Sequence, residues 1–411
     1  MQKFIKIIGE INYWMLVLLP FSVAIAPGFA NTVIGIMIGT FLVEKILKRE
    51  KPAGVFWPLL IFGVFMLIGL FSFINSVDWH ASTKGITKLL KSLMIFLVYS
   101  QQVRDRRHFM RIAIAAACAI TLAGVDALWQ LYSGKDFIRS NPLQGAIGLP
   151  RATAAFPGCN ALGIYLTALT PLVAGLALFY NPLKARVFFF IAALIGSIGV
   201  YLSLSRGAGL GFLVSVFLLC LIRKNKLILT GLFILVLVYP LVMPKNIKEW
   251  AKTRDNNPLL VLVDPARITI FENSINMIRQ HPVIGVGINT FSKNYGKYKT
   301  EHAESRFKTS DTYYAHNNFL HLAGEMGLLG LLVFLTFLGF VFRAVWRAFK
   351  QHADPFLKAL SISVLAAILA YLINGLTETS LYHSRLVMIF WFLIGLGLAL
   401  AKASGLKKIG N

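Results

Sequence analysis

Long apolar runs alternate with short polar segments along almost the whole chain. About 20 apolar residues can cross the hydrocarbon layer of a bilayer as a helix, because a helix satisfies its own backbone hydrogen bonds. Twelve runs are candidates, of which the fourth is short: residues 11–26, 32–47, 56–74, 86–99, 109–132, 160–180, 187–204, 207–222, 227–243, 319–342, 356–375 and 386–401. The pattern predicts an all-α integral membrane protein with about twelve transmembrane helices.

The polar segments divide the chain into three parts. Residues 1–243 are predicted to form transmembrane helices 1–9, residues 244–318 a large loop that contains short helices, and residues 319–411 transmembrane helices 10–12. A shorter polar segment, 133–157, precedes the sixth run. Because a membrane bundle with one large loop commonly builds a site between the two, we expect the loop to form part of an active site.

The composition agrees with a membrane protein. Only 14% of the 411 residues are charged and 57% are hydrophobic, which is too little charge for a soluble protein of this length. In a soluble protein the net charge of +24 would suggest nucleic-acid binding. Here Lys and Arg concentrate in the short gaps between apolar runs, which is typical of topology signals and of contacts with lipid phosphates. We therefore expect membrane lipids, and not nucleic acid, as partners.

The basic gaps also predict an orientation, because short loops rich in Lys and Arg stay in the cytoplasm. The gaps around residues 45–51, 104–107, 184–186, 223–226 and 343–358 alternate as twelve spans with both termini in the cytoplasm require. The prediction is a multi-pass membrane protein. Segments 133–157 and 244–318 then face the periplasm.

The large loop contains an amphipathic segment, residues 267–280. Ile268, Phe271, Ile275 and Ile278 fall on one helical stripe, which predicts a helix on the membrane surface or against the mouth of the bundle. Asp264 is the predicted N-cap, and Pro265 suits the first turn.

Two arginines are candidates for binding an anion. Arg206 lies between two apolar runs near their periplasmic ends, where an arginine is costly unless it reaches water, headgroups or an anion. Arg267 lies in the first turn of the loop helix, whose unpaired N–H groups favour a phosphate. The alternatives are a snorkelling arginine at a helix end for Arg206 and a solvated loop residue for Arg267.

His316 is the candidate base, because it lies at the predicted membrane boundary directly before the tenth run. A neutral histidine there can accept a proton from a hydroxyl, although it could equally be an interfacial polar residue beside Tyr313 and Tyr314. Asn317 is a possible supporting residue or a cap of the following helix.

Further polar residues are possible supports for such a site. Glu325 lies one turn after His321, and the two could form a functional group or a buried pair that holds helices together. Glu378 and Arg385 lie in the last predicted periplasmic turn, with His383 between them. Lys88 shares a helical face with Lys84 and Lys91 and could meet lipid phosphates or line a wet groove.

The sequence offers no motif for a metal or a cofactor. It has no Asp-x-Asp in the loops to hold a metal on a pyrophosphate, no phosphate-binding glycine loop, and no Cys or His spacing typical of zinc sites. We therefore expect neither a metal ion nor a cofactor.

Three motifs together resemble the O-antigen ligase and polymerase superfamily. They are Ser205-Arg206-Gly207, Arg267 followed by the segment His281-Pro282-Val283-Ile284-Gly285-Val286-Gly287, and Ala315-His316-Asn317-Asn318-Phe319-Leu320 with Glu325-Met326-Gly327-Leu328-Leu329-Gly330. The resemblance runs from about Arg151 to the C-terminus. It implies metal-free transfer of a glycan from undecaprenyl diphosphate to an acceptor hydroxyl. It also implies that Arg206 and Arg267 hold the donor diphosphate and that His316 is the general base.

The resemblance leaves the individual activity open. An O-antigen ligase would use lipid A-core as acceptor, and the short segment after the last apolar run favours it. An O-antigen polymerase would use a growing lipid-linked glycan, and a protein O-oligosaccharyltransferase a protein hydroxyl. A transporter of lipid-linked sugars would have as many spans, but it predicts matching repeats in the two halves, which the sequence does not show.

Overall fold

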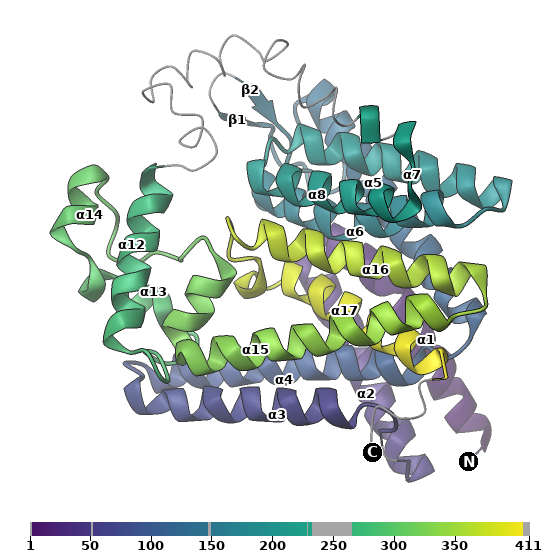
Figure 1. Cartoon of the computed structure of the whole chain (residues 1–411), viewed down its shortest axis with the longest axis horizontal. Coiled ribbons are helices and arrows are strands. Elements are labelled where there is room, and N and C mark those ends of the chain that lie inside the picture. The colour runs from purple at the N-terminus through teal and green to yellow at the C-terminus, as the bar shows by residue number, and fades with distance from the viewer. Residues whose placement is uncertain (1, 51, 147–148, 228, 232–264, 406–411) are drawn as a thin grey trace.

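The computed structural model describes residues 2–50, 52–146, 149–227, 229–231 and 265–405. Long helices run side by side along the molecule, and the short helices of the large loop cover one end of the bundle (Figure 1). The long helices are α1 (Gln2–Ile25), α2 (Pro27–Lys48), α3 (Phe56–Phe71), α4 (Trp79–Gln102), α5 (Arg106–Ser133), α6 (Cys159–Phe179), α7 (Leu183–Leu202), α8 (Arg206–Arg223), α15 (Asn318–Gln351), α16 (Pro355–Asn374) and α17 (Leu386–Ala403).

The remaining elements are short. They are the antiparallel strands β1 (Gln144–Ala146) and β2 (Leu149–Arg151), the loop helices α12 (Pro265–Gln280), α13 (Phe291–Asn294) and α14 (Glu301–Arg306), and the 3-10 turns η1 (Ser72–Asn75), η2 (Tyr295–Tyr298) and η3 (Ser380–Tyr382). The strand pair, which the apolar pattern does not predict, lies in the polar segment after α5.

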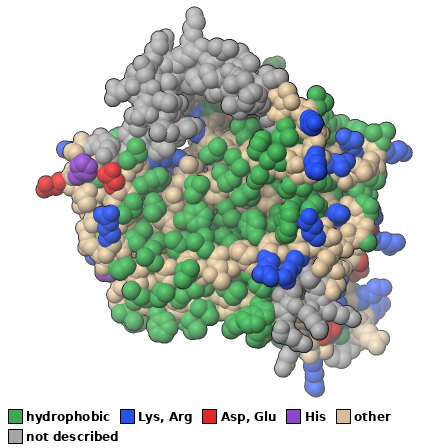
Figure 2. All heavy atoms as spheres, viewed as in Figure 1, with side chains coloured by type: hydrophobic (Ala, Val, Ile, Leu, Met, Phe, Trp, Pro, Cys, Tyr) green, Lys and Arg blue, Asp and Glu red, His purple; other side chains and the backbone are tan. Residues whose placement is uncertain are grey.

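The structure confirms an all-α membrane protein. Ten of the helices in the described ranges are long and apolar enough to cross a bilayer. The fourth predicted run is α4, a 24-residue helix that is not among these ten but packs along α17. The ninth predicted run, 227–243, lies almost wholly outside the described residues. Hydrophobic side chains cover the flank in Figure 2, and Lys and Arg gather mainly toward the end that carries the N-terminus.

Three helices form the centre of the bundle. The most apolar stretches of α6, α16 and α17 are 83%, 72% and 83% buried, against 33% for α2, α3, α7 and α8. A helix that is apolar on every side belongs in such a position. Within α1, Pro20 cannot donate to the carbonyl of Leu16, and the hydroxyl of Tyr99 donates to that oxygen instead (2.6 Å).

Helix α15 is broken where the loop joins it. Gly327 has φ +70°, and the backbone of the preceding loop segment fits against the break: a Cβ on this glycine would lie 2.0 Å from the carbonyl oxygen of Val283. The loop also pairs with the freed groups, because Val286 N donates to Gly324 O, Gly287 N to Glu325 O, and Leu328 N to Pro282 O. Segments 281–287 and 325–330, which the sequence separates by almost 40 residues, are therefore one structural unit.

The loop helix α12 confirms the predicted helix. Its fully buried residues include Thr269, Ile270, Asn273 and Met277, whereas Ile275 of the predicted stripe is 39% exposed. The loop has a small core of its own, and Asn273 hydrogen-bonds there to Tyr295 and Glu304. The other three residues of the stripe, Ile268, Phe271 and Ile278, are half-buried, so the stripe lies beside this core and partly faces solvent. The predicted cap, Asp264, lies outside the described residues.

Candidate active site

The carboxylate of Glu378, in the turn after α16, binds side chains from three distant parts of the chain. Arg267 of α12 donates from Nη2 to Oε1 at 2.5 Å, and Asn160 of α6 donates from Nδ2 to the same oxygen at 2.7 Å. Nδ1 of His316 lies 3.2 Å from Oε2. Two of the residues singled out in the sequence, Arg267 and His316, thus meet on a third, Glu378.

The cluster is partly shielded from solvent. The side chain of Glu378 is 11% exposed, that of Arg267 17% and that of His316 31%. Burial disfavours the charged carboxylate, but the hydrogen bond from His316 and the charge of Arg267 outweigh it, so the pKa of Glu378 lies below its usual value of 4.5. Glu378 is therefore ionised at neutral pH.

The ionised carboxylate selects which nitrogen of the His316 ring donates to it. A carboxylate can only accept hydrogen bonds, so Nδ1 of His316 must carry the proton and donate it to Glu378. In the neutral form of this tautomer, Nε2 has the lone pair. This is the arrangement of an oriented general base, in which a carboxylate holds one ring nitrogen and the other is free to take a proton.

The turn that carries His316 is strained and is held on both sides. His316 has φ +46°, in the left-handed region that few side chains adopt. The side chain of Asn317 caps α15 by accepting from Phe319 N and Leu320 N, and it also donates to the carbonyl of Leu376. Asn318 Nδ2 donates to Ser380. Asn317 and Asn318 therefore join the His316 turn to the turn that holds Glu378.

A second acid–histidine pair lies behind this turn. His321 Nε2 is 3.3 Å from Glu325 Oε1, and both side chains are almost fully buried. Nδ1 of His321 accepts from the backbone N–H of Ala315, and its ring packs on Tyr382 at 3.8 Å between centroids. Glu325 also accepts from Phe291 N. The geometry makes this pair a support for the His316 turn, because neither side chain reaches the surface of the cluster.

Arg206 begins α8 beside the same turn. Gly207 lies so close to the segment after α16 that a Cβ there would be 1.9 Å from Oγ1 of Thr377, the neighbour of Glu378. The side chain of Arg206 is exposed at this point. The glycine next to it thus serves the close approach of α8 to the Glu378 turn.

Two further residues of the site were not anticipated. They are Asn160 and Arg151. Arg151, at the end of β2, donates to Asn160 Oδ1 and to the carbonyls of Ser203 and Leu204, and so fixes the turn before Arg206. The one signal in the sequence is a basic residue in the polar segment 133–157 followed by an asparagine at the head of an apolar run. That signal is weak, because either residue could have been solvated.

Arg385 and Lys88 do not join the cluster. The guanidinium of Arg385 is buried, lies 4.3 Å over the ring of Phe156, and donates to the carbonyls of Val23, Ala24 and Ala155. It ties α1 to the segment before α6 and does not line the space around Glu378, which corrects the expectation from the sequence. Lys88 donates to Asn289 Oδ1 and lines a different pocket, which Glu325 and Tyr382 also border.

The comparison with known families agrees with this geometry. Residues 190–335 match the family model described as O-antigen ligase. Over this stretch the chain is similar to the O-antigen ligase superfamily. No curated protein matches the chain. The matched stretch contains Arg206, Arg267 and His316, whereas Glu378 and Asn160 lie outside it. That family consists of glycosyltransferase-type enzymes that act on lipid-linked glycans, and the apolar helices of this chain are consistent with a multi-pass membrane protein of that kind.

Proposed function

We propose that this protein is an O-antigen ligase. It transfers a glycan from undecaprenyl diphosphate to a hydroxyl of the lipid A-core oligosaccharide, without a metal ion, at the periplasmic face of the bacterial inner membrane. The observation that carries the proposal is the contact of His316 and Arg267 with one carboxylate, Glu378, beside the start of α8 at Arg206. A base can take the proton of an acceptor hydroxyl, and two arginines near it can bind the departing diphosphate.

In the proposed reaction Nε2 of His316 takes the proton of the acceptor hydroxyl. The acceptor oxygen forms a bond to the anomeric carbon as the bond from that carbon to the phosphate oxygen breaks, and undecaprenyl diphosphate leaves with the electron pair. Attack from the face opposite the leaving group inverts the anomeric carbon. Glu378 stabilises the positive charge that develops on the imidazole ring.

The two arginines serve the leaving group. The planar guanidinium of Arg267 has five N–H donors, and its contact with Glu378 uses one end of the group. The remaining donors, with those of Arg206, are suited to the diphosphate oxygens, whose negative charge grows as the bond breaks. Because the cluster is partly buried, each such contact is stronger than it would be in water.

The predicted orientation supports a periplasmic site. The cluster and α12–α14 lie at one end of the bundle, whereas Lys and Arg gather mainly at the other end, where α1 begins (Figures 1 and 2). With the positive charge on the cytoplasmic side, this arrangement supports a periplasmic position for Glu378 and His316.

The decisive test is transfer by the purified protein with a defined undecaprenyl-diphosphate glycan and lipid A-core as acceptor. We expect product with the wild type, and none above background with His316→Ala. The matched control is His302→Ala, which removes an exposed histidine of α14 from the same loop and retains activity. Elongation of the lipid-linked glycan without transfer to lipid A-core would refute the ligase and identify a polymerase. Full activity of His316→Ala would remove His316 from the mechanism.

A further inference from the structure

A polar pocket of about 440 Å³ lies at the end of the bundle opposite Glu378. It is lined by the first three turns of α1, the ends of α2 and α4, and the start of α5. Since α5 has 28 residues at about 1.5 Å each, this pocket and the Glu378 cluster are separated by roughly 40 Å. The inference below concerns only this pocket and does not depend on the proposed transfer reaction.

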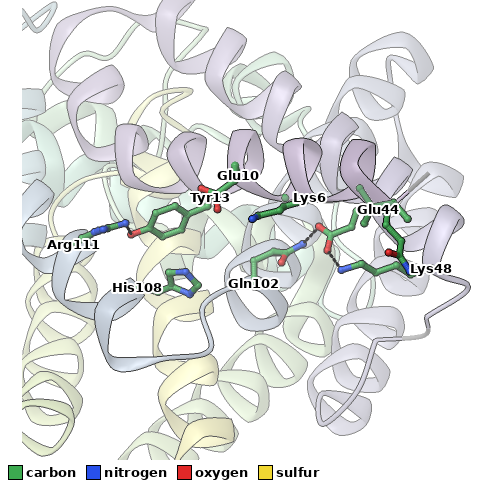
Figure 3. A pocket seen from close by; sticks show the side chains of 11 residues that line it. Lys6, Glu10, Tyr13, Glu44, Lys48, Gln102, His108 and Arg111 are labelled. Atoms are coloured by element: carbon green, nitrogen blue, oxygen red, sulfur yellow. Dashed lines mark hydrogen bonds and ion pairs between the residues drawn. The ribbon is translucent and has the colours of Figure 1, made fainter.

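One acidic side chain of the pocket is neutralised by its neighbours. Glu44, which is 4% exposed, accepts from Lys48 Nζ on one oxygen and from Gln102 Nε2 on the other, both at 2.6 Å. Figure 3 shows these two contacts on the α2 side of the pocket. Glu44 and Lys48 therefore offer little charge to a ligand.

Two cations remain on the other side of the pocket. Within the described part of the chain, Lys6 has no hydrogen-bonded or ion-paired partner, and in the view of Figure 3 it extends between Tyr13 and Gln102. Arg111 lies over the ring of Tyr13 at 5.7 Å and makes a long hydrogen bond of 3.4 Å to its hydroxyl. Glu10 is the acidic residue that faces them. Lys6 and Arg111 both line this pocket, and an ammonium and a guanidinium are suited to the oxygens of a phosphate.

The surface beside the pocket is apolar. Phe4, Ile7, Ile11 and Trp14 are each at least 40% exposed and form one stripe of α1. The lining residues of α1, from Gln2 through Gly9 to Tyr13, form the adjacent face of the same helix. A molecule with a phosphate in the pocket would thus have its attached hydrocarbon chains against this stripe. Tryptophan and tyrosine side by side are typical of the headgroup level of a membrane.

We propose that this pocket binds a phosphate ester and that the ester is the headgroup of a phospholipid, held by Lys6 and Arg111 with its acyl chains along α1. Gly9 contributes to the space of the pocket, because it lines the pocket and a Cβ built on it meets no atom within 4 Å. A pocket of this volume lies in the ordinary range of about 300–1,000 Å³ for small-ligand sites.

The test is native mass spectrometry of the full-length protein after delipidation and addition of phosphatidylethanolamine. Diacylglycerol, which has the same tails and no phosphate, is the lipid control, and glycerol 3-phosphate is the soluble phosphate ester. We expect retention of the phospholipid alone, and about tenfold less of it in Lys6→Gln and in Arg111→Gln. Lys3→Gln, which removes an exposed lysine of α1 that does not line the pocket, should retain it fully.

A second variant distinguishes lost binding from lost folding. Gly9→Leu fills the pocket without an evident clash, and Gly35→Leu is its control on α2, where a Cβ also meets nothing within 4 Å. We expect Gly9→Leu to lose the phospholipid and Gly35→Leu to keep it, with equal thermal stability of the two proteins in detergent. Equal retention in all variants would overturn the site. Pocket-dependent binding of glycerol 3-phosphate without any lipid would overturn the lipid as its source.

Discussion

The substitution Glu378→Gln tests the proposed mechanism most directly, because it keeps the shape of the side chain and removes its charge. The wild-type carboxylate contacts the positively charged Arg267 and the ring of His316, which becomes positive when it takes a proton. A hydrogen bond that involves a charged group contributes about 1.5–3 kcal/mol. If Glu378→Gln removes both charged contacts from the transition state, that state is destabilised by roughly 3–6 kcal/mol. Each ~1.4 kcal/mol is a tenfold change in rate. We therefore expect the rate of transfer to fall by at least about 100-fold.

The assay is initial-rate transfer of a labelled undecaprenyl-diphosphate glycan to lipid A-core. The matched control is Glu304→Gln, which removes a carboxylate of the loop that is 18% exposed and contacts Lys299 and Thr309. We expect this control to lower thermal stability but to leave the rate within about twofold. A rate for Glu378→Gln within about threefold of the wild type would refute the role of Glu378 as the group that orients His316.

A comparison of the wild type with Glu378→Gln also tests the ion cluster by its dependence on pH. The pKa of Glu378 is held below 4.5 in the folded protein and returns to about that value on unfolding, so the unfolded chain binds more protons. Its contribution to stability is therefore fully present well above pH 4.5 and is lost as the pH falls through the folded value. Thermal unfolding in detergent should show the wild type losing its advantage over Glu378→Gln as the pH is lowered below about 4.5. A constant difference down to pH 3 would contradict the assigned shift.

Three further predictions concern the donor, the kinked helix and the metal-free scheme. Arg267→Lys should reduce transfer about tenfold or more, because a lysine has no planar group that can contact Glu378 and a diphosphate at once. Its control, Arg279→Lys, changes an exposed residue of the same helix and should leave transfer unchanged. Gly327→Ala should lower the free energy of unfolding by about 3 kcal/mol, because of its φ of +70° and the contact with Val283; Gly339→Ala, with nothing within 4 Å, should be neutral in thermal unfolding. Transfer should continue in the presence of a chelator, and strict dependence on added Mg²⁺ would contradict the scheme.

The sequence determined the fold class and most of the elements. A bilayer leaves few ways to satisfy a backbone, so apolar runs of sufficient length had to be helices, and all the predicted runs within the described residues are helices. Local patterns also identified α12 as a helix and Arg206, Arg267 and His316 as candidates. The buried face of α12 could not be predicted in this way, since its partners, both apolar and polar, belong to a loop core that forms only on folding.

The tertiary structure alone decided which polar residues act together. Glu378, Arg385 and Lys88 were equal candidates in the sequence, yet Glu378 binds His316 and Arg267, Arg385 is saturated by backbone carbonyls, and Lys88 contacts Asn289. Asn160 and Arg151 entered the site with no strong local signal. The reason is physical: hydrophobic periodicity reports which face of a helix avoids water and is set by neighbouring residues. A hydrogen bond between residues 62 or 111 positions apart depends on how the helices pack, and no local pattern encodes it.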